Sequence, residues 1–441
     1  MSRRETKTIK LNKQGNERNL REHLSGKINT SLTGLWFLIP EYLRLGAWDL
    51  AKGLVGGDDK DINPRLAMQL VNESALCKTR IRKENYINSQ GFEAINGLSV
   101  LASDQQIHNL LNDLTMADAQ DFQQHLMAIR NNRGHFESNI LAIDPHRIKS
   151  TSSRTMQKKK KKPDEKAQKL YQTFFCNDVS QGQPLFFASG ASGKNTTKAT
   201  IEILENVKKI RPNALIIADK EHFTTNLFKY VTNNTDFELL VPAISRERIK
   251  KIERKLSYKR LWAGYAVAET NYKFGSDSYR LVVQRSGEAA DTYVYKSFLT
   301  ISKKSAEELM SAIYDERWSI EEFFNFDGEM GFDRASTFNM NIRHNKMSLA
   351  LLAQAATYEL RKKLPKPYKT WKSSHLSDAI FRNIEGDIRV EKDTIIVTCY
   401  NAPKDLNLPE IYQNLPKKLM DEGIDPRIPW LFDFKLDFRF K

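Results

Sequence analysis

The chain has 441 residues, 40% hydrophobic and 28% charged, a balance that supports folded cores and excludes a globally disordered protein. No apolar stretch reaches the ~20 residues of a membrane-spanning helix, and three widely separated cysteines form no disulfide or zinc spacing, so we expect a reduced, cytoplasmic protein without a membrane partner. The net charge of +15 is concentrated in two basic segments, 158–162 and 246–260, which favours a polyanionic partner such as nucleic acid.

The first 137 residues show two patterns. Residues 1–30 are polar and basic without an apolar period, which predicts a basic arm. Residues 31–137 have a helical period, and Ser103 followed by Gln106 forms the sequence of a capping box at a helix start. The expected structure here is a helical N-terminal domain.

From residue 138 onward the periodicity changes to that of strands. Short apolar runs alternate with helical patterns over 138–236, which predicts a mixed sheet covered by helices, an α+β fold. A β-rich insertion is expected over 237–303, and 304–350 returns to the core with a helix from Ser305 to Phe326. The remaining 351–441 form a C-terminal extension, with the end of a helix, one strand and a short final element.

Two aspartates stand at the ends of predicted strands. Asp144 follows the apolar run 139–143 and Asp219 follows 214–218, and each precedes a loop. Sites in helix-covered sheets gather beyond the carboxyl ends of the strands, and neighbouring carboxylates there are stabilised by a shared cation such as Mg²⁺. The alternative, which either residue alone would favour, is an Asp that opens a turn or caps a helix.

The helix predicted from Ser305 carries a third candidate group. Tyr314, Arg317 and Glu321 are spaced i, i+3 and i+7, which places them within about 60° on one helical face beside core residues. Such a stripe indicates a specific contact. The alternative is a surface stripe whose Arg–Glu pair contributes a few tenths of a kcal/mol.

Together these residues resemble the DDE transposases of bacterial insertion sequences, in the group with a Tyr-Arg-Glu-Lys signature. Asp144 in ILAIDPHRIKS, Asp219 in ALIIADKEHF and Glu321 in YDERWSIEEFF match the three acids, over roughly residues 138–350. The resemblance implies a ribonuclease H-like core interrupted by a β-rich insertion. One position departs from the signature, because Gly328 stands where the family has its lysine, and Lys346 and Arg334 are the candidates to replace it.

What the resemblance implies is metal-dependent cleavage and strand transfer at transposon ends, with Asp144, Asp219 and Glu321 holding two Mg²⁺ ions, for which Mn²⁺ can substitute. Such two-metal sites stabilise in-line phosphodiester displacement. The implied partners are double-stranded DNA, namely terminal inverted repeats bound by the N-terminal domain and target DNA, and a second copy of the chain in the DNA complex. The residues expected to contact DNA are Tyr314, Arg317, Lys158, Lys160, Arg248, Lys251, Arg254 and Lys346.

Other interpretations stay open at this stage. A segment resembling a phosphate loop, Ala188–Thr197, lacks the required Gly and Ser/Thr positions and is excluded as a nucleotide site. His146 and His222 follow the two aspartates closely and are expected near the site rather than as ligands. The alternatives to a transposase are a catalytically inactive, transposase-derived DNA-binding protein and a ribonuclease H-like nuclease that does not join strands.

Overall fold

The structure is a computed structural model, in which the chain divides into two compact units. The first unit combines the described residues up to Leu126 with Phe326–Lys441, and the second is Met127–Asn325. None of the helices among the described residues is long and apolar enough to cross a membrane. The residues described are 13–59, 61–78, 90–153, 155–160, 164–334, 337–366 and 368–441.

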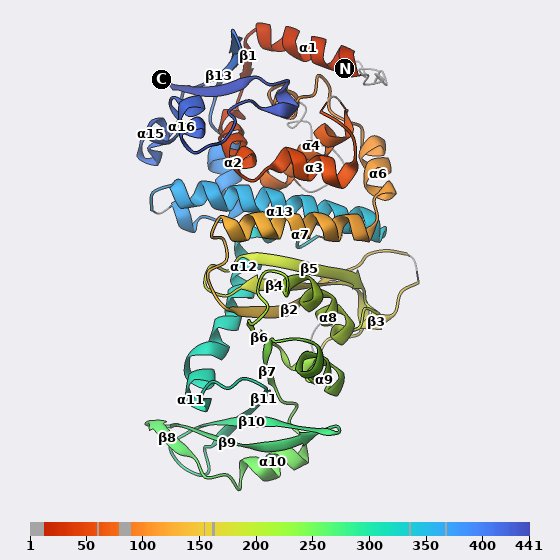
Figure 1. Cartoon of the computed structure of the whole chain (residues 1–441), viewed down its shortest axis with the longest axis vertical. Coiled ribbons are helices and arrows are strands. Elements are labelled where there is room, and N and C mark those ends of the chain that lie inside the picture. Colours follow the sequence, from red (N-terminus) through yellow and green to blue (C-terminus); the bar gives the residue numbers. More distant parts are fainter. Residues whose placement is uncertain are drawn as a thin grey trace. The chain divides into compact units, whose positions relative to one another are not determined.

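A mixed sheet forms the centre of the second unit, and the order of its core strands is β5-β4-β2-β6-β7 (Figure 1). The strands β2, β6 and β7 are parallel to one another, whereas β4 is antiparallel to β2 and β5 is antiparallel to β4. This confirms the predicted ribonuclease H-like α+β fold. The bounds are β2 (Ile140–Lys149), β3 (Lys158–Lys159), β4 (Gln168–Asp178), β5 (Pro184–Ala191), β6 (Leu215–Ala218) and β7 (Glu238–Pro242).

The inserted strands continue this same sheet. The antiparallel strand β11 (Val294–Thr300) pairs with β7, and β10 (Asp277–Ser286), β9 (Tyr265–Phe274) and β8 (Lys259–Trp262) follow in that order. The insertion was expected to begin at residue 237. The structure places β7 in the parallel core, because Leu215–Ile217 of β6 pair with residues of β7.

The two faces of the sheet carry different helices. Leu141 and Ile143 of β2 pack into a core with α8 (Thr196–Val207), α9 (Thr225–Asn234) and α10 (Glu247–Glu253). Ala142, which points to the opposite face, packs in a second core with residues of the segment 309–320. This alternation follows from the two-residue period of a strand.

The segment predicted as one helix from Ser305 to Phe326 has four parts. The Ser305 side chain accepts a hydrogen bond from the Glu308 N–H at the N-cap. The parts that follow are α11 (Ala306–Glu308), a π-helical turn (Leu309–Ile313), a 3₁₀ helix (Tyr314–Trp318) and α12 (Ser319–Asp327). A helix is therefore confirmed, but its winding changes three times before Glu321.

The first unit is mainly helical, with the long helix α13 (Met340–Lys363) packed on α4 (Asn63–Ala75). The predicted capping box of Ser103 and Gln106 is present at the start of α6 (Asp104–Asp113). The other helices of this unit are α2 (Ile39–Arg44), α3 (Ala47–Val55), α5 (Gln90–Ile95), α14 (Ser373–Leu376), α15 (Leu408–Tyr412) and α16 (Leu415–Asp421), and α7 (Met116–Asn132) extends from this unit into the second.

The residues expected to form a basic arm are ordered from Lys13 onward. They form α1 (Lys13–Ser25), whose Leu20 and Leu24 are buried, and β1 (Ile28–Thr30). The strand β1 pairs with β12 (Gly386–Glu391) in a four-stranded sheet completed by β13 (Thr394–Cys399) and β14 (Lys435–Phe440). The arm prediction is wrong for 13–30, because the partners that bury them lie at the other end of the sequence; residues 1–12 lie outside the described part.

Candidate active site

The register of the central parallel strands brings the two predicted aspartates together. Ile143 of β2 lies opposite Ala218 of β6, so Asp144 and Asp219 are the next residues on neighbouring strands, which run about 4.8 Å apart. Side chains alternate between the two faces of a sheet, and both aspartates lie two residues after strand residues that pack in the core with 309–320. Both aspartate side chains therefore point to the face that carries this segment. The predicted juxtaposition of Asp144 and Asp219 is thus present.

Asp144 was expected to end its strand, and here the structure differs. The strand β2 continues to Lys149 because β4 pairs with it as far as Leu170, whereas β6 stops at Ala218. Pro145, which has no N–H to donate, directly follows the aspartate at the point where β2 loses its parallel neighbour. The Asp144 carboxylate therefore lies at an opening on one edge of a continuing strand.

Arg317 links the irregular helix to this opening. Its Nη1 donates to Asp144 Oδ1 at 2.9 Å, and its Nη2 lies 3.8 Å from Glu321 Oε1. The guanidinium is only 15% exposed, and its Nε has no hydrogen-bond partner among the described residues. One cation thus joins two of the three predicted acids.

Electrostatics within the cluster separate the two aspartates. Burial, together with the charge of Asp219, raises the pKa of Asp144 to about 6, although the charge of Arg317 opposes the shift. Burial also acts to raise the pKa of Asp219, but a hydrogen bond from His222 and the backbone N–H of Glu221 outweigh it and hold that pKa below its usual range. Asp219 is the more stable anion of the pair.

His222 contacts Asp219 from the protein interior rather than from the open side of the site. Its side chain is fully buried, and Nδ1 lies 2.7 Å from Asp219 Oδ1, which leaves Oδ2 of the aspartate for other partners. His146 instead stacks on Phe324 of α12, with ring centroids 4.0 Å apart. Both histidines therefore support the site from the side, as the sequence suggested.

Tyr314 is half-buried against the sheet. Its ring contacts Phe298 edge-on at 4.6 Å between centroids. Burial raises the pKa of its hydroxyl, while the neighbouring charge of Arg317 acts in the opposite direction. The hydroxyl of Tyr314 thus lies beside the guanidinium and stays protonated at neutral pH.

A cluster of charges that the sequence did not reveal borders Asp219. Arg147 and Lys159 both donate to the Glu221 carboxylate, the lysine at 3.4 Å. Because side chains alternate along a strand, anchoring Lys159 leaves Lys158 and Lys160 on the opposite side, and both are exposed. Arg147 and Glu221 lie a few residues after each aspartate, which is the signal that could have identified them.

The basic segment of the insertion forms a helix over part of its length. Arg248, Lys251 and Arg254 lie on or directly after α10, a helix fixed by the buried Ile249. Arg248, Lys251 and Lys255 line a shallow pocket of about 460 Å³ with an apolar floor. A basic helix face with this floor suits a polyanion.

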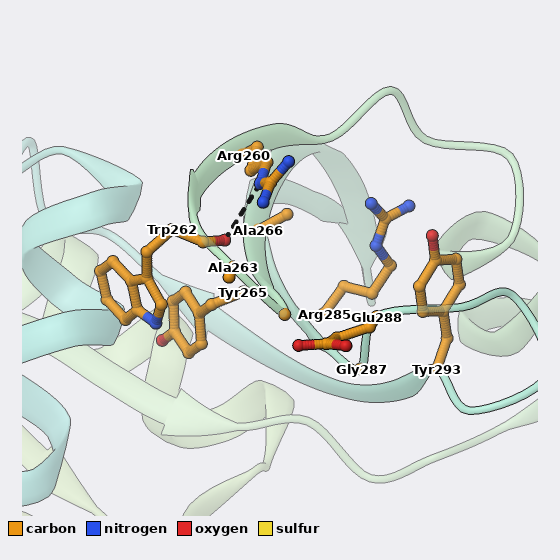
Figure 2. Close-up of a pocket in the computed structure, with 10 residues that line it drawn as sticks. Arg260, Trp262, Ala263, Tyr265, Ala266, Arg285, Gly287, Glu288 and Tyr293 are labelled. Atoms are coloured by element: carbon orange, nitrogen blue, oxygen red, sulfur yellow. Dashed lines mark hydrogen bonds between the residues drawn. The ribbon is translucent and has the colours of Figure 1, made fainter.

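A second pocket of the insertion, about 470 Å³, combines arginines with aromatic rings (Figure 2). Trp262, half-exposed, stacks on Tyr265 with centroids 4.3 Å apart. The Arg285 guanidinium lies over the Tyr293 ring at 4.1 Å, and Arg260 lines the same pocket. Arginines beside an exposed aromatic ring are a combination on which nucleic-acid bases stack in other proteins. Arg260 belongs to the basic segment 246–260 noted in the sequence, whereas Tyr265, Arg285 and Tyr293 were missed, although arginines and aromatic residues interleave over 254–265.

Lys346 and Arg334, the two candidates to replace the lysine of the signature, belong to the first unit. Lys346 is on α13 in the first unit and only 7% exposed, and burial lowers its pKa. Such a buried ammonium is poorly placed for a DNA contact. Gly328 is buried in a short 3₁₀ helix, Gly328–Met330, of the same unit, and Arg334 is exposed nearby in sequence.

The cluster of acids was tested for its fit to divalent cations. Among the described residues no group of three His, Cys, Asp or Glu side chains already surrounds one point closely enough to hold a metal ion. The donor chemistry nevertheless fits, because Asp144, Asp219 and Glu321 offer hard oxygen ligands, and burial together with the charges of Asp219 and Glu321 raises the pKa of Asp144. The fold is that of the ribonuclease H-like class, and Asp144 and Asp219 lie at the neighbouring strand positions expected from the sequence.

Comparison with known proteins identifies the family. Residues 135–355, half of the chain, match the family model described as Transposase DDE domain, and the protein belongs to this family. The chain is also similar to a solved structure, the cryo-EM structure of piggyBac transposase synaptic complex with hairpin DNA. The identity is 10% over 90% of this chain and 87% of that chain, with a TM-score of 0.40. No curated protein matches the chain.

Proposed function

We propose that the protein is a DNA transposase of the insertion-sequence type that cuts transposon ends and joins them to target DNA. The observation that carries this proposal is the register of β2 and β6, which sets Asp144 beside Asp219 on the face where Arg317 and Glu321 lie. Three carboxylates on one face of a ribonuclease H-like sheet suit phosphodiester chemistry with two Mg²⁺ ions, for which Mn²⁺ can substitute.

Each residue of the site has a distinct role in this proposal. Asp144, Asp219 and Glu321 would hold the two cations, which would supply activation of a water or a DNA 3′-hydroxyl for in-line attack. His222 orients Asp219 through its 2.7 Å contact. Arg317 binds a phosphate of the DNA, for which its planar fork offers two donors, and Tyr314 supports it.

DNA binding outside the site is assigned to the basic surfaces. Lys158 and Lys160, which are exposed on the side of their strand away from Lys159, and Arg248, Lys251 and Arg254 on the insertion neutralise backbone phosphates. The pocket of Trp262 accepts an unstacked base near the cut. Residues 31–137 bind the terminal inverted repeats, and two copies of the chain hold two ends together in a cytoplasmic, nucleoid-associated complex.

One observation favours a second candidate function. Gly328 replaces the lysine of the family signature, and the proposed substitute Lys346 is buried. A DNA-binding protein that has lost its catalysis is consistent with both facts. The complete acid set makes the enzyme the better supported proposal.

The test uses the full chain with supercoiled plasmid DNA carrying the two DNA segments that flank its gene. We expect nicking and joined products in Mg²⁺ or Mn²⁺, loss of both with EDTA, and background activity for Glu321→Gln. The matched control is Glu322→Gln, an exposed neighbour on the same helix, which should keep full activity. Tight DNA binding without metal-dependent nicking would support the inactive alternative, and nicking without joining would support a nuclease.

A further inference from the structure

The Arg317 guanidinium lies where a cation would neutralise the acids of the site. It donates to Asp144 at 2.9 Å and approaches Glu321 to 3.8 Å. Burial acts to lower the pKa of Arg317. The charges of its neighbours outweigh burial and raise this pKa; these neighbours are Asp144, Tyr314, Asp219 and Glu321. The positive charge of the arginine is therefore held mainly by the carboxylates proposed to hold metal.

A metal ion and this arginine compete for the same oxygen atoms. Mg²⁺ or Mn²⁺ bound to Asp144 Oδ1 at about 2.1 Å would lie within about 5 Å of Nη1, since the nitrogen is 2.9 Å from that oxygen. Two cations at this separation in a partly buried site repel each other strongly. The arginine must give up some of its contact with the acids when metal binds.

The helix around Arg317 is built in a way that permits such a movement. The residue lies in the 3₁₀ segment Tyr314–Trp318, between a π-helical turn and α12. Irregular turns of this kind recur at functional sites and lack the regular hydrogen bonding of an α-helix. The Nε atom has no hydrogen-bond partner among the described residues, so the guanidinium is held through its other nitrogens by the carboxylates and by the side chain of Tyr314.

We infer that Arg317 is a mobile counter-ion of the site, which neutralises Asp144 and Glu321 in the metal-free protein and transfers to a DNA phosphate as divalent cations bind. The inference rests on the proposed function and adds regulation to it. DNA and metal then bind cooperatively, because the phosphate removes the internal competitor from the acids. Without DNA the site stays weak for metal, which suppresses hydrolysis away from a substrate.

Binding of Mn²⁺ to the full, metal-free chain tests this directly, by calorimetry and by electron paramagnetic resonance, with and without a random-sequence DNA duplex. Without DNA, we expect Arg317→Gln to bind Mn²⁺ about tenfold more tightly than wild type, a typical size for such coupling. Arg317→Lys, which keeps the charge, should stay close to wild type. The duplex should raise the wild-type affinity by a similar factor and leave that of Arg317→Gln unchanged.

The control is Arg280→Gln, which breaks another arginine–carboxylate pair, with Glu269 on the neighbouring strand. Its Mn²⁺ affinity should equal that of wild type. Equal or weaker Mn²⁺ binding by Arg317→Gln in the absence of DNA would overturn the inference while leaving the proposed function intact. Failure of the proposed function looks different: Asp144→Asn would then bind Mn²⁺ as well as wild type.

Discussion

Replacing Asp144 with asparagine removes a negative charge that the parallel sheet forces beside Asp219. In the folded protein the pKa of Asp144 is raised from its ordinary value of 3.8 to about 6, chiefly by burial. A raised pKa means that the folded state holds the proton more tightly than the unfolded state does. The stabilising contribution of this proton is complete below about pH 4 and is lost as the pH rises through 6.

The size of the effect follows from the same two values. The difference between 3.8 and about 6 corresponds to about 3 kcal/mol, at about 1.4 kcal/mol per pH unit. The carboxylate is 21% exposed, so solvent reduces this figure, and we expect Asp144→Asn to gain about 1–3 kcal/mol at pH 7.5. For a unit of this size, that is a rise of several degrees in Tm.

The assay is thermal unfolding of the full chain in EDTA between pH 4 and 8. The asparagine variant should be more stable than wild type at pH 7.5, and the difference should vanish near pH 4. Adding Mg²⁺ should raise the Tm of wild type at pH 7.5 and leave that of the variant nearly unchanged, because bound metal relieves the repulsion only where the ligands exist. A variant that is less stable than wild type at every pH would refute this reasoning.

Three further changes probe other parts of the molecule. His222→Asn should weaken Mn²⁺ binding about 10- to 100-fold in calorimetry, since Asp219 loses the partner that orients it. Arg361→Met should lower the free energy of unfolding by about 3–5 kcal/mol in denaturant titrations, because Asp327, 2.8 Å away, stays buried without its cation. Lys251→Gln should reduce the salt slope of DNA binding in fluorescence anisotropy by about 0.9, the value for one lost phosphate contact.

Each of these has an outcome that contradicts it. Unchanged Mn²⁺ affinity in the histidine variant would show that the contact with Asp219 does not position a ligand. The control for Arg361 is Lys362→Met, a 40% exposed neighbour expected to change stability by no more than about 0.5 kcal/mol, and equal losses in both would exclude a buried-pair effect. An unchanged salt slope for Lys251→Gln would remove α10 from the proposed DNA surface.

Much of the sheet and the position of the aspartates followed from local patterns. Continuous apolar runs ending in Asp144 and Asp219 predicted buried strands of a mixed sheet. The structure shows these two strands to be parallel, which brings their carboxyl ends to one edge. The length of β2 could not be predicted this way, because pairing with β4 carries it on to Lys149. The apolar run of β2 does not indicate where the neighbouring strand on one side ends while the neighbouring strand on the other side continues.

Long-range contacts limited the remaining predictions. The i, i+3, i+7 spacing assumed an unbroken α-helix, but the π-helical and 3₁₀ turns over 309–318 change the angle per residue. The contact of Arg317 with Asp144, 173 residues earlier, depends on how this helix packs on the sheet. Likewise, Leu20 and Leu24 are too few to show a helical period within a basic segment, although both are buried.

The pairing of β1 with β12 has a consequence for the time at which the first unit can form during synthesis. Ile28 meets Ile388, so a ribosome adding about 5–20 residues per second needs roughly 20–70 s to produce the partner strand. Residues 127–325, by contrast, are contiguous and can fold while the rest is still being made. A nascent chain can therefore contain a folded second unit while its first unit is still incomplete. Any interruption of translation before β12 leaves the apolar surfaces of the early helices open to chaperones and proteases.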